Sequence, residues 1–289
     1  MSIQDEVKAA ESPLGLTGVK HVIAVASGKG GVGKSTLSLG LAIGLQSQGL
    51  KVGLLDADIY GPSQQQLLGV AANTQAEVIN GKTIKPVLAQ GLKTMSMAYL
   101  VNERTPMVWR GPMASSALQQ MMFQTDWGEL DILVVDLPPG TGDIQLTLSQ
   151  KIELAGAVVV STPSDLALLD AKKAIEMFAK VKVPLLGLVE NMSYHKCESC
   201  GHQSYLFGQE GAEQIQAQYQ VPILGRIPLD AHFRVACDSG QTQAYFNDES
   251  GSTNHHHAMK QIFKDIAQGV IQSLETPQSQ APVIEDIDQ

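Results

Sequence analysis

Residues 28–36 read Gly28-Lys29-Gly30-Gly31-Val32-Gly33-Lys34-Ser35-Thr36 and match the pattern G-x-x-x-x-G-K-[ST]. An apolar run at 21–26 precedes this stretch and an apolar-rich segment at 35–49 follows it, which predicts a strand, a loop and a helix. The glycines let successive backbone N–H groups curl around a phosphate, and the helix adds the positive end of its dipole. The stretch therefore predicts a nucleotide-phosphate site. Lys34 is expected to supply an ammonium group and the Ser35 hydroxyl to ligate Mg²⁺, neither side chain packing in the core.

Carboxylates stand where a nucleotide-bound Mg²⁺ needs them, at the carboxyl ends of predicted strands. Asp136 ends the run LVVD and is followed by a turn rich in proline and glycine at 137–143. Asp56 and Asp58 end the run GLLDAD. A strand-end aspartate often caps the next helix instead. Three such aspartates around one phosphate loop favour a metal and nucleotide site.

Short apolar runs rich in β-branched residues alternate along the chain with segments of helical periodicity. The runs predict strands at 21–26, 51–56, 92–100, 131–136, 155–161 and 183–191. Helices are predicted at 35–49, 112–124, 142–154, 165–180, 208–219 and 255–274. This alternation is typical of a parallel sheet with helices on both faces. We therefore expect an α/β fold, a doubly wound, mostly parallel sheet flanked by helices, in one domain at 19–274.

Composition and charge disfavour several classes of partner. The chain of 289 residues is 44% hydrophobic and 17% charged, as in globular rather than disordered proteins. Its formal net charge of −9 disfavours a surface that neutralises nucleic acid. No apolar run reaches the roughly 18 to 20 residues that cross a bilayer, and the first residues lack the apolar core of a secretory signal. We expect a cytoplasmic protein that binds neither nucleic acid nor a membrane.

The two ends of the chain depart from the alternating pattern. Residues 1–18 are polar and contain a Ser-Pro pair, which predicts a flexible arm. Residues 275–289 combine prolines with acids and predict a disordered acidic tail. Just before it, the last predicted helix begins with His255, His256 and His257. Adjacent imidazoles on a helix point in different directions, so exposed side chains are expected there rather than a metal site.

The phosphate loop and four further motifs together resemble a known family. Lys29 is the extra lysine that marks the deviant phosphate loops of MinD-, ParA- and nitrogenase-iron-protein-type ATPases. The further motifs are GLLDADIYGPS at 53–63, MVWRGPM at 107–113, LVVDLPPGTGD at 133–143 and VENMSY at 189–194. With the pair Cys197 and Cys200, they resemble the Mrp family of ATP-binding iron–sulfur cluster carriers over about residues 18–270. Many members have a small additional N-terminal domain, in place of which only a short arm is expected here.

The resemblance implies a role for individual residues of the site. Lys29 is similar to the lysine that reaches across a homodimer to the partner's nucleotide, where a cation stabilises charge on the transferring phosphate. Asp58 matches the switch I aspartate that orients the attacking water, and Asp136 matches the acid beside Mg²⁺. The segment 140–143 matches the switch II turn. Asn191 matches the asparagine that hydrogen-bonds adenine.

Cys197 and Cys200 form a C-x-x-C pair within 195–202, a polar stretch typical of a surface loop. Two thiolates hold one side of a metal, whereas a closed zinc site or a [4Fe–4S] cluster needs about four ligands. Three interpretations stay open from the residues, namely a redox-active pair, a zinc site that adds His195 or His202, and a cluster shared between two subunits. The resemblance favours the third, in which the same cysteines of a second copy complete the ligand set.

Taken together, the motifs predict an ATPase of slow turnover that holds a labile [4Fe–4S] cluster at a homodimer interface and transfers it to apo iron–sulfur proteins. ATP and Mg²⁺ are the implied cofactors, and zinc is a possible substitute for the cluster. The alternative is a nucleotide-dependent positioning switch of the ParA or MinD type, which would leave the cysteine pair unexplained. Cys237 has no partner in the sequence and is expected to be a buried or incidental thiol.

Overall fold

The protein is built around one eight-stranded sheet. The computed structural model describes residues 16–100, 111–140, 145, 148–149, 151–247 and 254–276. The sheet comprises β1 (Val19–Ala26), β2 (Val52–Asp56), β5 (Val87–Ala89), β6 (Leu92–Ser96), β7 (Leu130–Asp136), β8 (Gly156–Ser161), β9 (Leu185–Asn191) and β12 (Ile223–Ile227). Their spatial order is β12-β9-β8-β1-β7-β2-β6-β5. All neighbours are parallel except β5, which runs antiparallel to β6.

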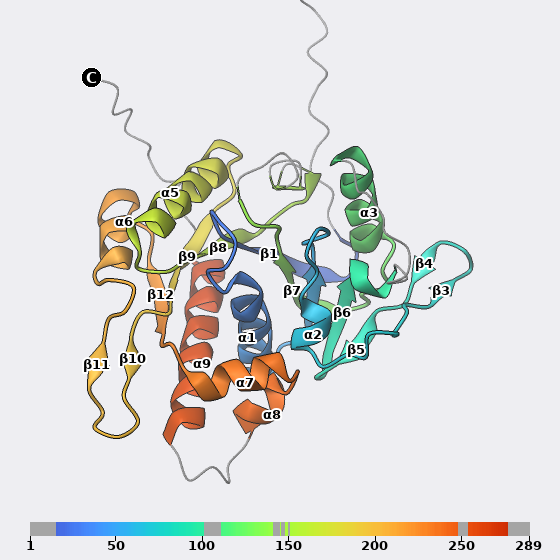
Figure 1. Cartoon of the computed structure of the whole chain (residues 1–289). Coiled ribbons are helices and arrows are strands. Elements are labelled where there is room, and N and C mark those ends of the chain that lie inside the picture. The colour runs from blue at the N-terminus through green and yellow to red at the C-terminus, as the bar shows by residue number, and fades with distance from the viewer. Residues whose placement is uncertain are drawn as a thin grey trace, which may run out of the picture.

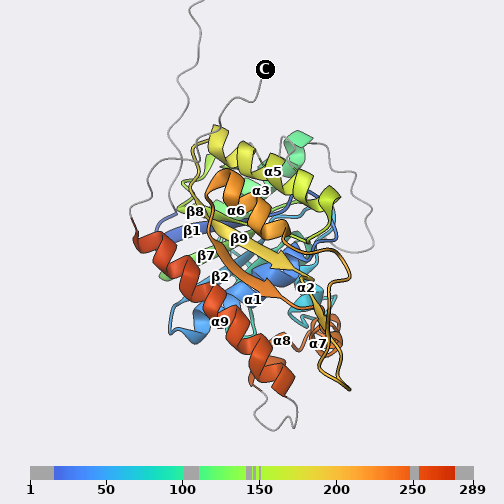
Figure 2. The ribbon, with the colours of Figure 1, turned by 90° about the vertical axis from the view of Figure 1, so that its left-hand side faces the viewer.

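Helices cover both faces of the sheet (Figures 1 and 2). One face carries α3 (Gly111–Phe123), α5 (Asp165–Lys180) and α6 (Gly211–Tyr219). The other carries α1 (Lys34–Ser47), α7 (Ala231–Asp238), α8 (Thr242–Asn247) and α9 (Asn254–Glu275). This is the doubly wound α/β arrangement predicted from the alternation of strands and helices.

Side-chain alternation along the strands explains the two layers. Val22 and Ala24 of β1 pack with α3 and α5, whereas Ile23 and Val25 pack with α1 and α9. Successive side chains of a strand point to opposite faces, so a strand buried on both faces reads as a continuous apolar run. The interior strands β2 and β9 are buried along their whole length.

The closest helix packing is that of α1 on α9. A Cβ added to Gly40 of α1 would lie 2.2 Å from the ring of Phe263, and one on Gly44 would lie 2.6 Å from the Phe263 carbonyl oxygen. Glycine at both positions therefore lets the two helices approach. Phe263 is 1% exposed, and its ring also packs at a tilt against those of Phe233 and Phe246. The phosphate loop precedes α1 directly, so this packing fixes the helix on which the loop ends.

Three predicted elements depart from the structure by three or more residues at one end. The strand predicted at 92–100 ends at Ser96, because the Ser96 hydroxyl accepts a hydrogen bond from the Ala98 N–H at 3.2 Å and starts a 3₁₀ turn at Met97–Tyr99. The helix predicted from 208 begins only at Gly211, since Glu210 has a left-handed φ of 62°. Of the helix predicted at 142–154, the described residues 145, 148, 149 and 151 are helical, whereas 152–154 are not.

Several elements have no counterpart among the predicted ones. They are β12, β5, α7, α8, the short helix α2 (Gln64–Leu67) and two hairpins, β3 (Val78–Ile79) with β4 (Thr83–Ile84) and β10 (His195–Lys196) with β11 (Gln203–Ser204). β12 and β5 are the edge strands and are only partly buried. Gly225 and Arg226 interrupt the apolar run of β12, and β5 spans only three residues. The predicted arm at 1–18 and tail at 275–289 fall outside the described residues except for 16–18 and 275–276.

Phe263 offers a test of the α1–α9 packing. We expect Phe263→Ala to lower the free energy of unfolding by about 3–5 kcal/mol, the usual cost of deleting a buried phenyl ring. Urea denaturation followed by circular dichroism measures this change. Leu88→Ala is the matched control, since Leu88 is 74% exposed on the edge strand, and its effect should stay within about 0.5 kcal/mol. Equal effects of the two substitutions would contradict the packing argument.

Candidate functional site

The phosphate loop turns between β1 and α1. Gly31 and Gly33 have φ angles of 85° and 87°, in the left-handed region that residues with a side chain rarely adopt. Gly33 immediately precedes the first turn of α1, so the loop runs into the positive end of the helix dipole. The Ser27 hydroxyl donates to the Lys29 carbonyl oxygen at 2.8 Å and closes the base of the loop. This backbone is suited to bind an anion.

Two glycines of the loop are also required by close contacts with neighbouring elements. A Cβ on Gly28 would lie 2.0 Å from the Asp170 carbonyl oxygen of α5. A Cβ on Gly33 would lie 2.1 Å from the Nδ2 atom of Asn191, at the end of β9. The glycines therefore shape the loop and let it sit directly against α5 and β9.

Lys34 and Asp136 form the central ion pair of the site. The Lys34 Nζ and Asp136 Oδ1 atoms are 2.5 Å apart, and the side chains are 6% and 0% exposed. The Ser38 hydroxyl donates to the same carboxylate oxygen at 3.0 Å, and the Gln64 amide donates to the other at 2.9 Å. The sequence-based expectation that Lys34 stays out of the core is therefore wrong, because in this structure a buried carboxylate holds the ammonium group.

Asp56 lies beside Asp136 on the neighbouring strand and organises the loop that follows β2. Its carboxylate accepts backbone hydrogen bonds from Asp58, Ser63 and Gln64 at 3.1, 3.0 and 3.1 Å. Burial and the nearby Asp136 carboxylate raise the pKa of Asp56 to about 7, against the opposing effect of the backbone donors. Asp56 thus acts as the anchor of the loop that carries Asp58, rather than as a group open to the pocket.

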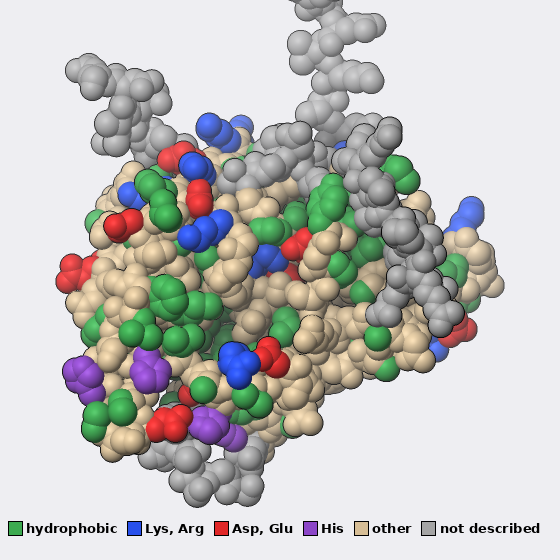
Figure 3. All heavy atoms as spheres, in the orientation of Figure 1, with side chains coloured by type: hydrophobic (Ala, Val, Ile, Leu, Met, Phe, Trp, Pro, Cys, Tyr) green, Lys and Arg blue, Asp and Glu red, His purple; other side chains and the backbone are tan. Residues whose placement is uncertain are grey.

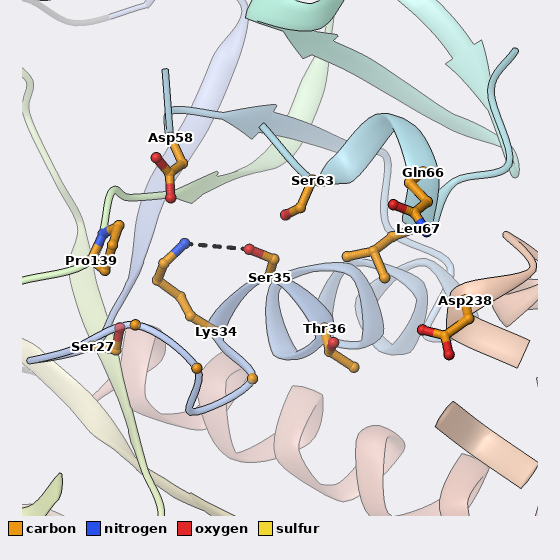
Figure 4. A pocket seen from close by; sticks show the side chains of 13 residues that line it. Ser27, Lys34, Ser35, Thr36, Asp58, Ser63, Gln66, Leu67, Pro139 and Asp238 are labelled. Atoms are coloured by element: carbon orange, nitrogen blue, oxygen red, sulfur yellow. Dashed lines mark hydrogen bonds between the residues drawn. The ribbon is translucent and has the colours of Figure 1, made fainter. Parts of the chain in front are cut away.

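A pocket of about 290 Å³ opens in front of the phosphate loop. Figure 3 shows the hollow, with acidic and basic side chains at its floor, and Figure 4 shows the residues around it. Its lining consists of Ser27, Gly30, Gly31, Gly33, Lys34, Ser35, Thr36, Asp58, Ser63, Gln66, Leu67, Pro139 and Asp238. Asp58 is half-buried and accepts the Gly61 N–H at 3.2 Å, and burial raises the pKa of its carboxyl group. The structure therefore brings Asp58 and the phosphate loop to one cavity, and the role of Asp58 in orienting water stays a prediction.

The residues around Lys34 fit a hydrated Mg²⁺ ion. The Ser35 hydroxyl and the Asp136 carboxylate are oxygen ligands of the kind that Mg²⁺ prefers. Gln64 is 1% exposed, and its Oε1 atom has no hydrogen-bond partner among the described residues, although its Nε2 donates to the Ser35 carbonyl and to Asp136. A buried acceptor without a donor is costly. A water on the ion would satisfy it.

Asn191 and Lys29 both lie at the phosphate loop, and the roles predicted for them stay predictions. Asn191 is buried, and its amide donates to the Val32 carbonyl oxygen at 2.8 Å. It therefore supports the phosphate loop, and a contact with adenine stays a prediction for its remaining donor and acceptor capacity. Lys29 is half-buried on the loop, beside rather than inside the lining of the pocket. The contact predicted between Lys29 and the nucleotide of a second subunit requires a dimer, and it stays a prediction.

The cysteine pair lies in the exposed loop of the β10–β11 hairpin. The Cys197 N–H donates to the His202 carbonyl at 2.9 Å, and the Gly201 N–H donates to the Cys197 carbonyl at 2.8 Å. Hydrogen bonds from the backbone N–H groups of Cys200 and Ser199 lower the pKa of the Cys197 thiol. Cys200 is exposed. The hairpin therefore presents two sulfur atoms at the surface and stabilises the thiolate form of one.

The part of the chain that the structure describes holds no group of three or more His, Cys, Asp or Glu side chains arranged for a metal ion. Within it, neither His195 nor His202 completes a zinc site around the cysteines, so the interpretation as a zinc knuckle closed by one subunit is not supported. Cys237 is buried in α7, as predicted, and burial raises the pKa of its thiol to about 11.

Two further expectations can be compared with the described residues. His257 is exposed as predicted, whereas His256 is half-buried, because the centroid of its ring lies 4.1 Å from that of Tyr245 on α8. The switch II turn at 140–143 is described only at Gly140, whose N–H donates to the Ser27 carbonyl oxygen at 3.0 Å. Among the described helices, none combines the length and apolar character that a bilayer crossing requires.

Sequence reasoning missed five residues at or near the site. Ser38 and Gln64 bond the Asp136 carboxylate, Asp238 lines the pocket, and Glu198 pairs with His232. Gln64 lies in a run of three glutamines and Asp238 ends a short helix, so no motif marks them. Their roles depend on contacts between segments that are distant in the sequence.

Comparison with known proteins places these features in context. The family described as NUBPL iron-transfer P-loop NTPase, of the ParA type, matches residues 18–270. The chain is 53% identical over 243 residues to an iron-sulfur cluster carrier protein of Pseudomonas fragi. The matched residues cover 84% of this chain and 85% of that protein. It is 52% identical over 247 residues to the protein of the same name from Escherichia coli strain K12, with coverages of 86% and 67%.

Solved structures are similar to this fold. A nucleotide-binding protein from Archaeoglobus fulgidus, in complex with ADP, is 40% identical with a TM-score of 0.70, over 78% of this chain and 89% of that one. The cell division ATPase MinD from Pyrococcus furiosus is 20% identical with a TM-score of 0.60, over 87% of this chain and 98% of that one, and shows the fold alone. The predicted fold class is confirmed.

The buried ion pair gives a prediction for the apo protein. We expect Lys34→Ala to lower the free energy of unfolding by about 3 kcal/mol, the lower end of the cost of leaving a buried charge unpaired, because two hydrogen bonds to Asp136 remain. Urea denaturation measures the change. The double variant Lys34→Met, Asp136→Asn removes both charges and should recover most of the loss. Full stability of the single variant would show that the pair is absent in solution.

Proposed function

Because the chain belongs to the ParA-type family of NUBPL iron-transfer P-loop NTPases, we propose that it is an ATP-binding and ATP-hydrolysing carrier of iron–sulfur clusters. It receives a labile [4Fe–4S] cluster, holds it at a homodimer interface and passes it to apo iron–sulfur proteins in the cytoplasm. A single domain at 19–274 carries both functions. Curated relatives named iron-sulfur cluster carrier protein, at 53% and 52% identity, support the cargo.

One observation carries the proposal beyond the family. The same chain has a complete phosphate loop with its buried Lys34–Asp136 pair and, at the surface, a hairpin that offers two sulfur ligands. A [4Fe–4S] cluster takes four thiolates, so two copies of Cys197 and Cys200 match one cluster. A site completed only by two subunits is also open to release, because separation of the subunits removes half of its ligands.

We assign ATP hydrolysis to the residues that surround the pocket in front of the phosphate loop. The backbone N–H groups of the phosphate loop and Lys34 bind the phosphates, which requires Lys34 to exchange its contact with Asp136 for one with the nucleotide. Ser35, Asp136 and Gln64 would hold hydrated Mg²⁺, which would neutralise phosphate charge when bound. Asp58 orients the attacking water. Lys29 of a second copy adds positive charge, and Asn191 contacts adenine.

Transfer of the cargo is a ligand exchange. Cysteine thiolates of the client replace the thiolates of Cys197 and Cys200 on iron, so that the cluster keeps its charge and neither protein is oxidised. The lowered pKa of Cys197 favours the thiolate that binds the cluster. The exposed position of the loop gives a client access to the cluster.

A nucleotide-dependent positioning switch is the competing function. The MinD-like structures support only the fold at their 20% identity. A switch of that type makes no use of the cysteine hairpin. Cluster binding by Cys197 and Cys200 therefore discriminates between the two functions.

The bridging model predicts the effect of cysteine substitutions. We expect Cys197→Ala or Cys200→Ala to abolish stable cluster binding, since either change removes two of the four ligands in a symmetric dimer. Anaerobic reconstitution with iron and sulfide, followed by metal counting and size-exclusion chromatography, should give about four irons per dimer in the unmodified protein. The cluster should shift the population toward dimer, because it binds only the dimer.

Cys237→Ala is the matched control, because Cys237 is the buried third cysteine and lies away from the hairpin on α7. It should reconstitute like the unmodified protein. A cluster retained when Cys197 and Cys200 are both replaced, or full occupancy in a strictly monomeric species, would contradict the bridging model.

A further prediction separates binding from hydrolysis. We expect Asp58→Asn to leave ADP affinity nearly unchanged and to slow single-turnover ATP hydrolysis by about a hundredfold, the lower end of what a positioned proton-transfer group contributes. Calorimetry and quenched-flow product analysis measure the two quantities. Asp131→Asn is the control, since Asp131 pairs with Lys20 at the opposite end of β7. Loss of affinity with unchanged turnover in the bound fraction would refute this role.

A further inference from the structure

Helix α7 contacts both the nucleotide pocket and the cysteine hairpin. Its last residue, Asp238, lines the pocket together with Thr36 and Leu67 (Figure 4). In its first turn, the Nε2 atom of His232 lies 3.2 Å from the Oε1 atom of Glu198, the residue that follows Cys197. Figure 1 shows α7 between the hairpin and α2.

We propose that α7 transmits the occupancy of the nucleotide pocket to the cysteine hairpin, and that the side-chain contact between His232 and Glu198 is the one through which it holds the hairpin. This inference rests on the proposed function, because it requires a nucleotide in the pocket. It assigns His232 and Glu198 as positioning residues for the cargo site.

On the pocket side, the end of α7 is packed against the segment that follows Asp58. A Cβ on Gly69, just after α2, would lie 2.6 Å from the Gly240 carbonyl oxygen. The Gln90 amide donates to the Leu67 and Gly240 carbonyl oxygens, at 3.4 and 3.0 Å, and so joins the two segments. One oxygen of the Asp238 carboxylate pairs with the Arg234 guanidinium on the same helix. A carboxylate at this position accepts hydrogen bonds from sugar hydroxyls, which suits the ribose end of a nucleotide. Binding there restrains both α2 and α7.

On the hairpin side, the base and the tip are held differently. The base is fixed to the connection between β12 and α7, because the Ser193 N–H donates to the Ile227 carbonyl at 3.0 Å and the Leu229 N–H to the Tyr194 carbonyl at 2.7 Å. The tip at 197–202 is almost entirely exposed. Glu198 is the tip residue that reaches α7, where histidine and acidic side chains gather in Figure 3.

The strength of this contact suits a switch. Both side chains are about half exposed, at 51% and 59%. Exposed ion pairs are weak and are readily broken. The pair can therefore open and close without unfolding either element, and a small displacement of α7 is enough to change how long the tip stays docked.

Hydrogen–deuterium exchange of the apo protein, with and without saturating Mg-ADP, tests the inference. We expect Mg-ADP to slow exchange several-fold in α7 and in the hairpin at 195–204. In His232→Ala, α7 should still respond, whereas the response of the hairpin should fall below about a third of its normal size. The affinity for Mg-ADP, measured by calorimetry, should fall by no more than the several-fold by which the hairpin response is lost, because His232 does not line the pocket and coupling between two sites is reciprocal.

Two further variants serve as controls. Reversal of the pair, with His232→Glu and Glu198→Lys together, should restore the response of the hairpin. Lys173→Ala breaks an exposed ion pair, with Asp170 on α5 at 3.1 Å, and should leave the response intact.

Three outcomes would overturn the inference. One is a full response of the hairpin in His232→Ala, which would place the coupling in the strand connections. Another is an α7 that does not respond although calorimetry shows bound ADP. Absence of ADP binding to the unmodified protein would refute the proposed nucleotide function itself, and this inference with it.

Discussion

The buried contact between Lys34 and Asp136 is the interaction on which the rest of the site depends. Burying two charges is expensive, and the cost is met only when the geometry is close and the remaining oxygen atoms receive hydrogen bonds. Both conditions hold, with a distance of 2.5 Å and further donors from Ser38 and Gln64. The pair connects the start of α1 to the end of β7. The hydrogen bond from Gln64 to Asp136 connects both elements to the segment after β2. The residues that would handle a nucleotide are therefore coupled in the apo protein, and a phosphate competes for the ammonium group that holds them together.

The parallel sheet explains why these residues meet. β1, β7 and β2 are neighbours with the same direction, and Asp56 and Asp136 are paired in register. Their carboxyl ends consequently lie at one edge, where ligands of open α/β sheets bind. Burial of both faces by helices leaves the ends of the strands as the place for polar side chains. The close approach of Gly28 to α5 and of Gly33 to Asn191 then presses the phosphate loop against this edge.

The cysteine hairpin is held together by local contacts, unlike the nucleotide pocket. Its fold is local, since backbone hydrogen bonds within 197–202 place the two cysteines in one short loop. The ligand set within the described residues is nevertheless incomplete. A site of this kind has little affinity alone and gains it by association, which suits cargo that must leave again. The position of α7 against both the hairpin and the pocket gives the chain a physical means to relate the two events.

The sequence by itself determined the elements whose signals are local. The phosphate loop could be predicted because its glycines meet a backbone requirement. The interior strands could be predicted because burial on both faces demands continuous apolar runs. The edge strand β12 and the helices α7 and α8 were not readable, since partly exposed elements carry no such run. The burial of Lys34, the contacts of Gln64 and the meeting of His232 with Glu198 were decided only by the tertiary structure. Each joins segments separated by many residues, and the free energy of such a contact depends on desolvation and distance, which no local pattern records.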